Sequence, residues 1–167
     1  MKKYVFSVNS IRELKKDISK FESRLPRLKR KFIKYSLDFL EQRAKYWIRQ
    51  TTGGSSWYVL THELENSFKK DATVGKIIND CWWSAYVEFG TGVVGEGTHE
   101  DPQNYQYDIN NHGEDGWWFK DDKGRLHWTK GMTAHRFMYQ AMNEYVNGEY
   151  KKIFKKAFDE VIGGIFK

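Results

Sequence analysis

The sequence predicts an α+β fold in a single domain over residues 1–167. A helical pattern of apolar residues runs through residues 27–49, and a second occupies residues 133–162. Between them, two short β-prone segments flank a glycine. A chain of 167 residues can bury one substantial hydrophobic core. We therefore expect a long central helix and a C-terminal helix packed on a small antiparallel sheet, with a long aromatic-rich excursion before the last helix.

The first residues predict a strand followed by a short helix. Alternating apolar residues favour a strand over Lys3–Val8. Ser10, followed three residues later by Glu13, forms a capping-box pattern that predicts a helix over Ile11–Phe21. Pro26 then indicates a new helical start, because proline suits a first turn and disturbs a helix interior.

The segment Arg27–Arg49 is the clearest predicted helix. Its apolar positions cover an arc of roughly 220°, whereas a surface helix needs only about 100°. Such a helix must be covered on two sides. Either it is the central core helix of the domain, or a neighbouring subunit supplies part of the cover. The glycine-containing segment Thr51–Ser56 is expected to be the loop that ends it.

Shorter elements are expected in the middle of the chain. Trp57–Phe68 carries a short helical pattern, and Lys69–Val74 and Lys76–Cys81 predict an antiparallel hairpin around a glycine. Trp83–Phe89 is too short for its periodicity to decide between one helical turn and a third strand.

The excursion Gly90–Gly131 is rich in glycine, asparagine and aspartate but contains three tryptophans. Loops of this length are uncommon in compact domains and usually carry a function. Trp117–Lys120 and Arg125–Thr129 are expected to form a hairpin with a type I turn. We therefore expect an ordered excursion that packs on something.

The C-terminal segment Thr133–Ile162 predicts a helix whose apolar face shifts midway. Asn147 and Gly148 lie at the change, and such a pair is a natural break. The last helix is therefore expected to be kinked or split at this point.

Charge is distributed unevenly along the chain. Residues 1–50 hold 15 Lys and Arg against 5 Asp and Glu, whereas residues 51–110 hold 3 against 9. This asymmetry fits nucleic-acid binding or self-association of a basic part with an acidic part. The candidate nucleic-acid contacts are Arg27, Lys29, Arg30 and Lys31, with a second lysine cluster at residues 151–156. A solvated helical face explains the same pattern.

The sequence offers little for catalysis. Gly90–Gly95 matches the G-x-G-x-x-G pattern, but acidic residues follow it and would repel a pyrophosphate, which favours a plain glycine-rich turn. A metal could be bound only if folding brought together His99, Glu100, Asp101 and His112. We expect no enzyme activity, cofactor or metal.

The single cysteine, Cys81, excludes an intramolecular disulfide and indicates folding in a reducing compartment. Its neighbour Asp80 disfavours a thiolate, so a small buried residue is expected rather than a nucleophile. We also expect no signal peptide and no membrane partner, because the N-terminal apolar run is short and followed at once by charges.

Three stretches together resemble a tail-component family of tailed bacteriophages. They are Leu64–Phe68 (LENSF), Ala85–Gly92 (AYVEFGTG) and Trp128–Ala141 (WTKGMTAHRFMYQA). They are similar to the family's Leu-x-x-Ser element, its Val-Glu-Phe-Gly-Thr signature and its Phe-bearing helix start. The family's two prolines around that phenylalanine are His135 and Gln140 here, and the excursion is longer.

The resemblance implies a non-enzymatic α+β subunit of a ring in the phage neck or upper tail, which completes the tail or joins it to the head. Its partners would be further copies and other neck or tail proteins. It would be found in the virion, and in the host cytoplasm during assembly. The expected interface residues are Glu88, Phe89, Trp117, Trp118, Trp128, Arg136 and Phe137. The tryptophans are expected there because interfaces concentrate aromatic residues and arginine, whereas Glu88, Phe89 and Phe137 could instead stabilise the fold of the chain itself.

Overall fold

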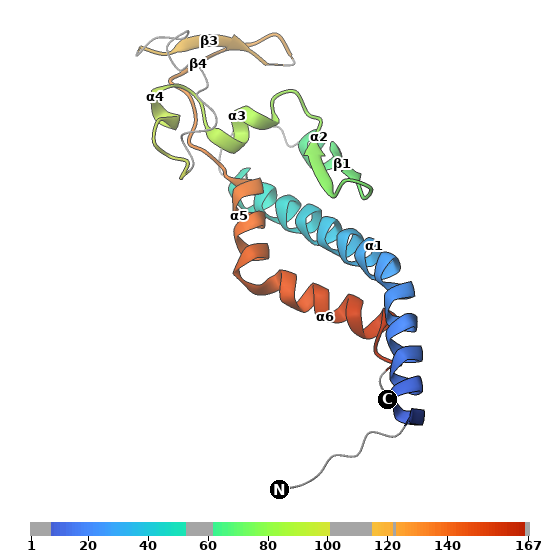
Figure 1. Cartoon of the computed structure of the whole chain (residues 1–167). Coiled ribbons are helices and arrows are strands. Elements are labelled where there is room, and N and C mark those ends of the chain that lie inside the picture. Colours follow the sequence, from blue (N-terminus) through green and yellow to red (C-terminus); the bar gives the residue numbers. More distant parts are fainter. Residues whose placement is uncertain (1–7, 53–61, 101–114, 122, 166–167) are drawn as a thin grey trace, which may run out of the picture.

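The structure, a computed structural model, describes residues 8–52, 62–100, 115–121 and 123–165. The long helix α1 (Val8–Thr52) forms the body, and α5 (Phe137–Glu144) and α6 (Tyr150–Val161) run back along it (Figure 1). The remaining elements are α2 (Glu63–Asn66), β1 (Phe68–Asp71), β2 (Lys76–Asn79), α3 (Ser84–Phe89), α4 (Gly92–Gly95), β3 (Trp117–Lys120) and β4 (Leu126–Thr129). Of these, α3, α4 and the β3–β4 hairpin lie beyond one end of the helices, whereas the β1–β2 hairpin packs beside α1, where Lys70 pairs with Asp38. The α+β class is confirmed, although the C-terminal helices pack mainly on α1 rather than on a sheet.

The helix α1 is continuous through Pro26, so the expected break at this proline is wrong. Figure 1 shows the helix changing direction in its N-terminal half, as a proline without an N–H and with a bulky ring requires. Packing outweighs the local preference, because Phe21 and Leu28 on either side pack into the same cluster. The expected strand Lys3–Val8 lies outside the described residues except for Val8, which begins α1.

Two apolar clusters hold α1 to the C-terminal helices. In the first, Leu40, Ala44 and Ile48 of α1 pack against Phe137 and Ala141 of α5, with the β1–β2 hairpin at the edge. In the second, Leu28 packs against α6 and the residues after it, namely Ala157, Val161, Ile162 and Ile165. Over residues 28–48, most of the wide apolar arc is therefore covered within the chain, as expected for a central core helix, although Phe32 borders an open apolar pocket.

The middle of the chain agrees with the expectations in part. Strands β1 and β2 form the expected hairpin, with Phe68 opposite Asn79, and Trp83–Phe89 resolves into the helix α3. Of the helical pattern expected over Trp57–Phe68, α2 confirms Glu63–Asn66, but the last two residues are wrong, because Ser67 follows the helix and Phe68 begins β1. α1 also extends to Thr52, beyond the expected start of the loop at Thr51. Residues 53–61, which include the rest of the expected loop and the first five residues of the expected helical pattern, lie outside the described residues.

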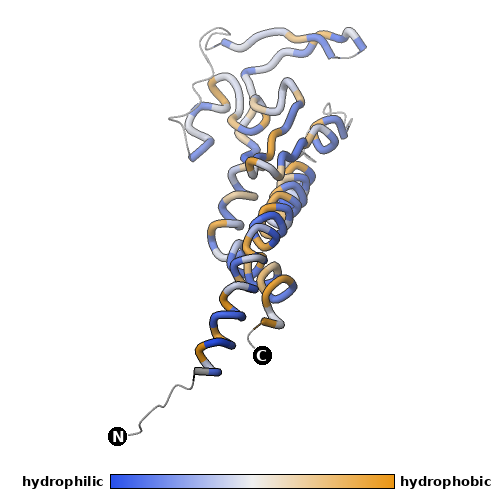
Figure 2. Tube along the Cα trace, turned by 45° about the vertical axis from the view of Figure 1, so that its right-hand side comes forward, coloured by the Kyte–Doolittle hydropathy of each residue, from blue (hydrophilic) through white to orange (hydrophobic). Residues whose placement is uncertain are grey.

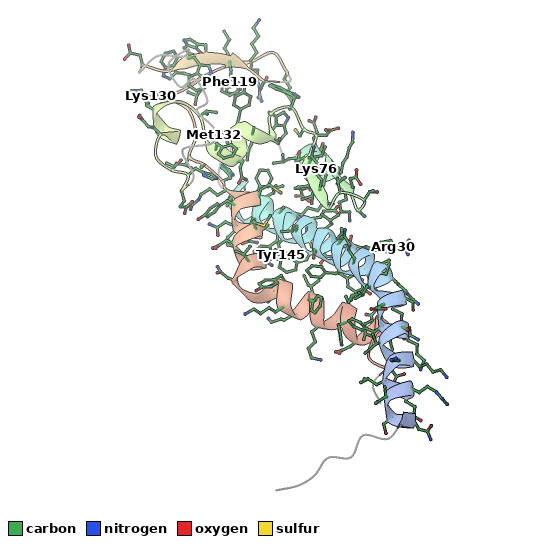
Figure 3. All side chains as sticks on the ribbon, viewed as in Figure 1. Arg30, Lys76, Phe119, Lys130, Met132 and Tyr145 are labelled. Carbon is green, nitrogen blue, oxygen red and sulfur yellow. The ribbon has the colours of Figure 1, made fainter. Side chains whose placement is uncertain are left out.

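The expected split of the C-terminal helix is confirmed. The π-helical turn η2 (Tyr145–Glu149) separates α5 from α6, and Gly148 within it has a φ of 140°. Glycine permits this backbone conformation, which L side chains rarely adopt. The helix begins at Phe137 rather than at Thr133. Tyr145 lies between α1 and the C-terminal helices (Figure 3), where its hydroxyl donates to Ser36 at 2.9 Å.

A polar clamp joins α1 to α5. The Arg43 guanidinium binds the Glu144 carboxylate through two nitrogens, with a distance of 2.6 Å for Nη2, and the Trp47 indole N–H donates to the same carboxylate at 2.9 Å. The hydrogen bond from Arg43 holds the pKa of Glu144 below its usual value. Such charge-assisted bidentate pairs are among the stronger hydrogen bonds in proteins.

Replacement of this carboxylate, Glu144→Ala, is expected to lower the free energy of unfolding by about 2 kcal/mol at pH 7. Because the pKa of Glu144 is depressed on folding, its contribution is present above the unfolded pKa of about 4.3 and lost as pH falls through the folded pKa. Urea denaturation at a series of pH values should show the difference from wild type shrinking below about pH 4. Asp159→Ala, which removes an exposed pair with Lys155, is the control and should change stability by less than about 0.5 kcal/mol.

Candidate functional site

Glu88 acts as the N-terminal cap of α5. The residue before that helix, Arg136, has a left-handed backbone (φ 54°) and its side chain makes no capping hydrogen bond. Instead, the backbone N–H groups of Met138 and Tyr139 each donate to one Glu88 carboxylate oxygen, both at 2.8 Å. These N–H groups have no partner within the helix, and a carboxylate also favours the positive end of the helix dipole.

The backbone reinforces this cap. The His135 N–H donates to the Val87 carbonyl at 2.8 Å, and the Arg136 N–H donates to the Glu88 carbonyl at 3.1 Å. Phe137 follows directly and is only 1% exposed, with its ring edge-on to Phe68. Glu88 and Phe137, which we expected at a subunit interface, are therefore buried within the chain and join α3 to α5.

Glycines allow the two motif segments to approach each other closely. Thr91 and Met132 exchange backbone hydrogen bonds of 2.9 and 3.0 Å as an isolated antiparallel bridge. A Cβ on Gly90 would come within 2.8 Å of the Met132 carbonyl oxygen, and one on Gly131 within 1.8 Å of the Thr91 carbonyl oxygen. In this structure the Gly-x-Gly-x-x-Gly pattern thus serves a tight chain crossing, which agrees with the glycine-rich turn expected.

The histidine considered as a metal ligand lies in an aromatic setting. His99 is buried, its ring centroid 4.6 Å from that of Phe89, and its Nε2 lies 3.5 Å from a Glu88 carboxylate oxygen. Glu100 is exposed and pairs with Arg136. Asp101 and His112 lie outside the described residues. Of the four residues considered as metal ligands, the structure therefore tests only His99 and Glu100, whose side chains contact different partners.

The β3–β4 hairpin presents an exposed aromatic face. Trp118 lies opposite Trp128 and Lys120 opposite Leu126, and these four side chains point to the exposed side. Trp118 is 62% exposed and Trp128 48% exposed, with ring centroids 5.4 Å apart in an edge-on arrangement. We call Trp118, Leu126 and Trp128 the hairpin face. Trp117, which we also expected at an interface, is half-buried on the other side.

Two features fix the hairpin. Its turn is tied by Asp121, whose carboxylate accepts backbone N–H bonds from Lys123 and Arg125 at 2.9 and 2.8 Å and lies 3.0 Å from the His127 ring. His127, followed by the bonds to Arg125 and Lys123, holds the pKa of Asp121 far below its usual value. On the less exposed side, Phe119 stacks on His127 at 5.3 Å. The face is thus ordered within the hairpin itself.

Sequence reasoning missed Leu126 and Trp82. Leu126 could have been found from the alternation Leu126–Trp128 opposite Trp118, because alternate residues of a strand share a face. Trp82 is 80% exposed, next to Tyr86. Its position before a short helix of uncertain type gave no signal of its exposure.

The basic residues considered for nucleic-acid binding fall into two groups. Arg27, Lys29 and Arg30 are exposed, and Figure 3 shows Arg30 on the side of α1 away from α6. Lys31 instead forms an ion pair with Glu160, whose hydrogen bond raises the pKa of Lys31. In the second cluster, Lys152 and Lys155 pair with acidic residues of α6 or the turn before it.

Cys81 is buried, as expected, and burial raises the pKa of its thiol. Within the described ranges, no three His, Cys, Asp or Glu side chains cluster as metal ligands would. Among the same residues, no helix has the length and apolar character needed to span a membrane.

No protein-family model, curated protein or solved structure matches this chain.

Proposed function

We propose that this chain is a non-enzymatic structural subunit of a tailed bacteriophage or prophage virion, a ring-forming component of the neck or upper tail. In this role it completes the tail or joins it to the head, and its partners are further copies and other neck or tail proteins. The observation that carries the proposal is the hairpin face, an ordered patch of two tryptophans and a leucine exposed beyond one end of the helical body.

The chemistry of this face suits a protein partner. Tryptophan is among the residues that contribute most to protein interfaces. Paired rings on a two-stranded hairpin lose little conformational freedom on binding, so more of the contact energy contributes to affinity. An exposed tryptophan pair and leucine would otherwise be a liability for solubility.

The resemblance to the tail-component family supplies the phage context. The signature residues Glu88–Gly92 act here as the connection between α3, α5 and the stem of the β3–β4 hairpin. A signature with this role suits a virion subunit, because it would hold a contact surface at a defined angle to the helical body. Assembly in the host cytoplasm and residence in the virion belong to the same proposal.

The double variant Trp118→Ser/Trp128→Ser tests the hairpin face. Supplied in place of the wild-type gene in the encoding phage, it is expected to leave heads and tails unjoined and to reduce infectious particles by at least roughly 100-fold, because loss of two interface tryptophans removes several kcal/mol. Electron microscopy of lysates measures joined particles. The control is Trp82→Ser, which removes an even more exposed tryptophan outside the hairpin face.

Normal joining in the double variant would contradict the proposed interface. Salt-sensitive binding of the purified protein to double-stranded DNA, abolished by Arg27→Ala/Lys29→Ala/Arg30→Ala, would favour the nucleic-acid alternative instead. The circular dichroism spectrum of each variant should match wild type, since all these side chains are exposed.

A further inference from the structure

The N-terminal part of α1 carries an exposed apolar stripe. Ile11, Leu14, Ile18 and Leu25 are each 40–55% exposed, and Figure 2 shows hydrophobic bands recurring along this part of the helix. Together with Phe21 and Leu28, they follow alternating spacings of three and four residues. This is the heptad spacing with which helices pack against one another. We call Ile11, Leu14, Ile18 and Leu25 the α1 stripe.

The stripe leads into an open apolar pocket. The pocket has a volume of about 550 Å³ and is lined by Leu25, Pro26, Leu28, Lys29, Phe32 and Phe154. At 100° per residue, the stripe together with Leu28 and Phe32 falls within an arc of about 100° of the helix circumference. Stripe and pocket therefore form one continuous surface, which extends the seam that α6 covers further along α1.

We propose that a second copy of this chain covers the surface, with the two α1 helices antiparallel. If residue 18 faces residue 21 of the other copy, Leu14 faces Leu25. Ile11 then lies level with Leu28, which is itself buried against α6, and beside the pocket that Leu25, Phe32 and Phe154 line. Each Ile11 then enters the pocket of the other copy, and every apolar layer forms twice about one twofold axis. Such an isologous contact needs one self-complementary surface, which the stripe and pocket together provide.

Charges beside the stripe favour this direction. On one flank Lys15 faces Glu22 of the second copy. On the other, Asp17, which pairs with Lys20 of its own helix, faces Arg24, which donates to the Val161 carbonyl of its own chain at 3.0 Å, so that opposite charges meet four times. In a parallel, in-register pair Asp17 would face Glu22 and Arg24 would face Lys29, which repel. The remaining lysines and arginines nearby, such as Lys16 and Arg27, lie on the opposite side of the helix at 100° per residue.

This contact goes beyond the proposed virion role, since it uses no residue of the hairpin face. It can therefore be tested in the purified full-length chain, whatever the protein's biological setting. Trp118→Ser/Trp128→Ser should leave it unchanged, so that failure of one proposal is distinguishable from failure of the other.

Disulfide trapping tests the direction, in a Cys81→Ala background. Ile18→Cys lies near the twofold axis and should give a covalent dimer under mild oxidation. Ile11→Cys should not, because the two copies of residue 11 would be about 25 Å apart along the helices. A parallel pair would trap both variants and overturn the proposal. Trapping of neither variant would also overturn it.

Sedimentation equilibrium of the untrapped protein measures the contact itself. Leu14→Ser should raise the dimer dissociation constant by on the order of 100-fold, because the lost apolar contact occurs twice. Lys15→Glu should raise it roughly tenfold, and Lys15→Glu/Glu22→Lys should restore it. Lys16→Glu makes the same charge change away from the surface and serves as the control. A wild-type chain that stays monomeric at every concentration, or a charge swap that fails to rescue, overturns the proposal.

Discussion

Gly131→Ala is expected to lower the free energy of unfolding by more than about 3 kcal/mol, through two effects that act together. The backbone of Gly131 has a φ of +106°, which L side chains rarely adopt. An added Cβ would also meet the Thr91 carbonyl oxygen at 1.8 Å and the Gly92 Cα at 2.9 Å. These obstacles are backbone atoms, so a rotamer change cannot relieve them, and the bridge between Thr91 and Met132 must open.

Gly124→Ala separates these two effects. Gly124 has a φ of +76° in the turn of the β3–β4 hairpin, but a Cβ there would meet nothing within 4 Å. This variant should therefore show the conformational cost alone, about 1–2 kcal/mol. Urea denaturation followed by circular dichroism compares the two. Equal losses would mean that the close approach of the two motif segments contributes nothing to stability.

Several elements followed from local sequence signals. Gly148 marks the split of the C-terminal helix because its backbone conformation depends on the residue itself. Both hairpins were predicted because β-prone segments flank short turns, and their pairing is local. Burial of Cys81 agreed with the ordinary preference of an unpaired cysteine for the interior.

The structure differs from the sequence-based expectations where contacts between distant segments determine the outcome. Pro26 indicated a helix start, but apolar packing on both of its sides keeps α1 continuous. Likewise, the sequence pattern of Glu88 beside Phe89 is the same whether the glutamate binds a partner or its own chain. Only the meeting of Glu88 with residues fifty positions away reveals its role as a helix cap. The exposure of Trp118 and Trp128 also depends on which face of the hairpin the rest of the chain covers.

Substitution of this cap should have the second large effect. Glu88→Gln is expected to lower the free energy of unfolding by about 2 kcal/mol, and Glu88→Ala by about 3 kcal/mol. Both carboxylate oxygens accept a backbone N–H. The amide of glutamine offers one oxygen and one NH₂, so one N–H of α5 would face another donor. Alanine leaves both N–H groups without an acceptor at a buried site. Glu96→Gln, at an exposed position of the same region, is the control and should have little effect.

Amide hydrogen exchange gives a readout specific to the cap. In Glu88→Gln, the amides of Met138 and Tyr139 should exchange faster, whereas those in the middle of α6 should change no more than global stability requires. If the proposed virion role holds, the same variant should also reduce joining of phage heads to tails, because the segment between β4 and α5 leads into the first turn of α5 and would lose its fixed direction. Unchanged exchange at these two amides would show that Glu88 does not cap the helix. Faster exchange with normal joining would mean that the hairpin face does not need a rigid connection to the helical body.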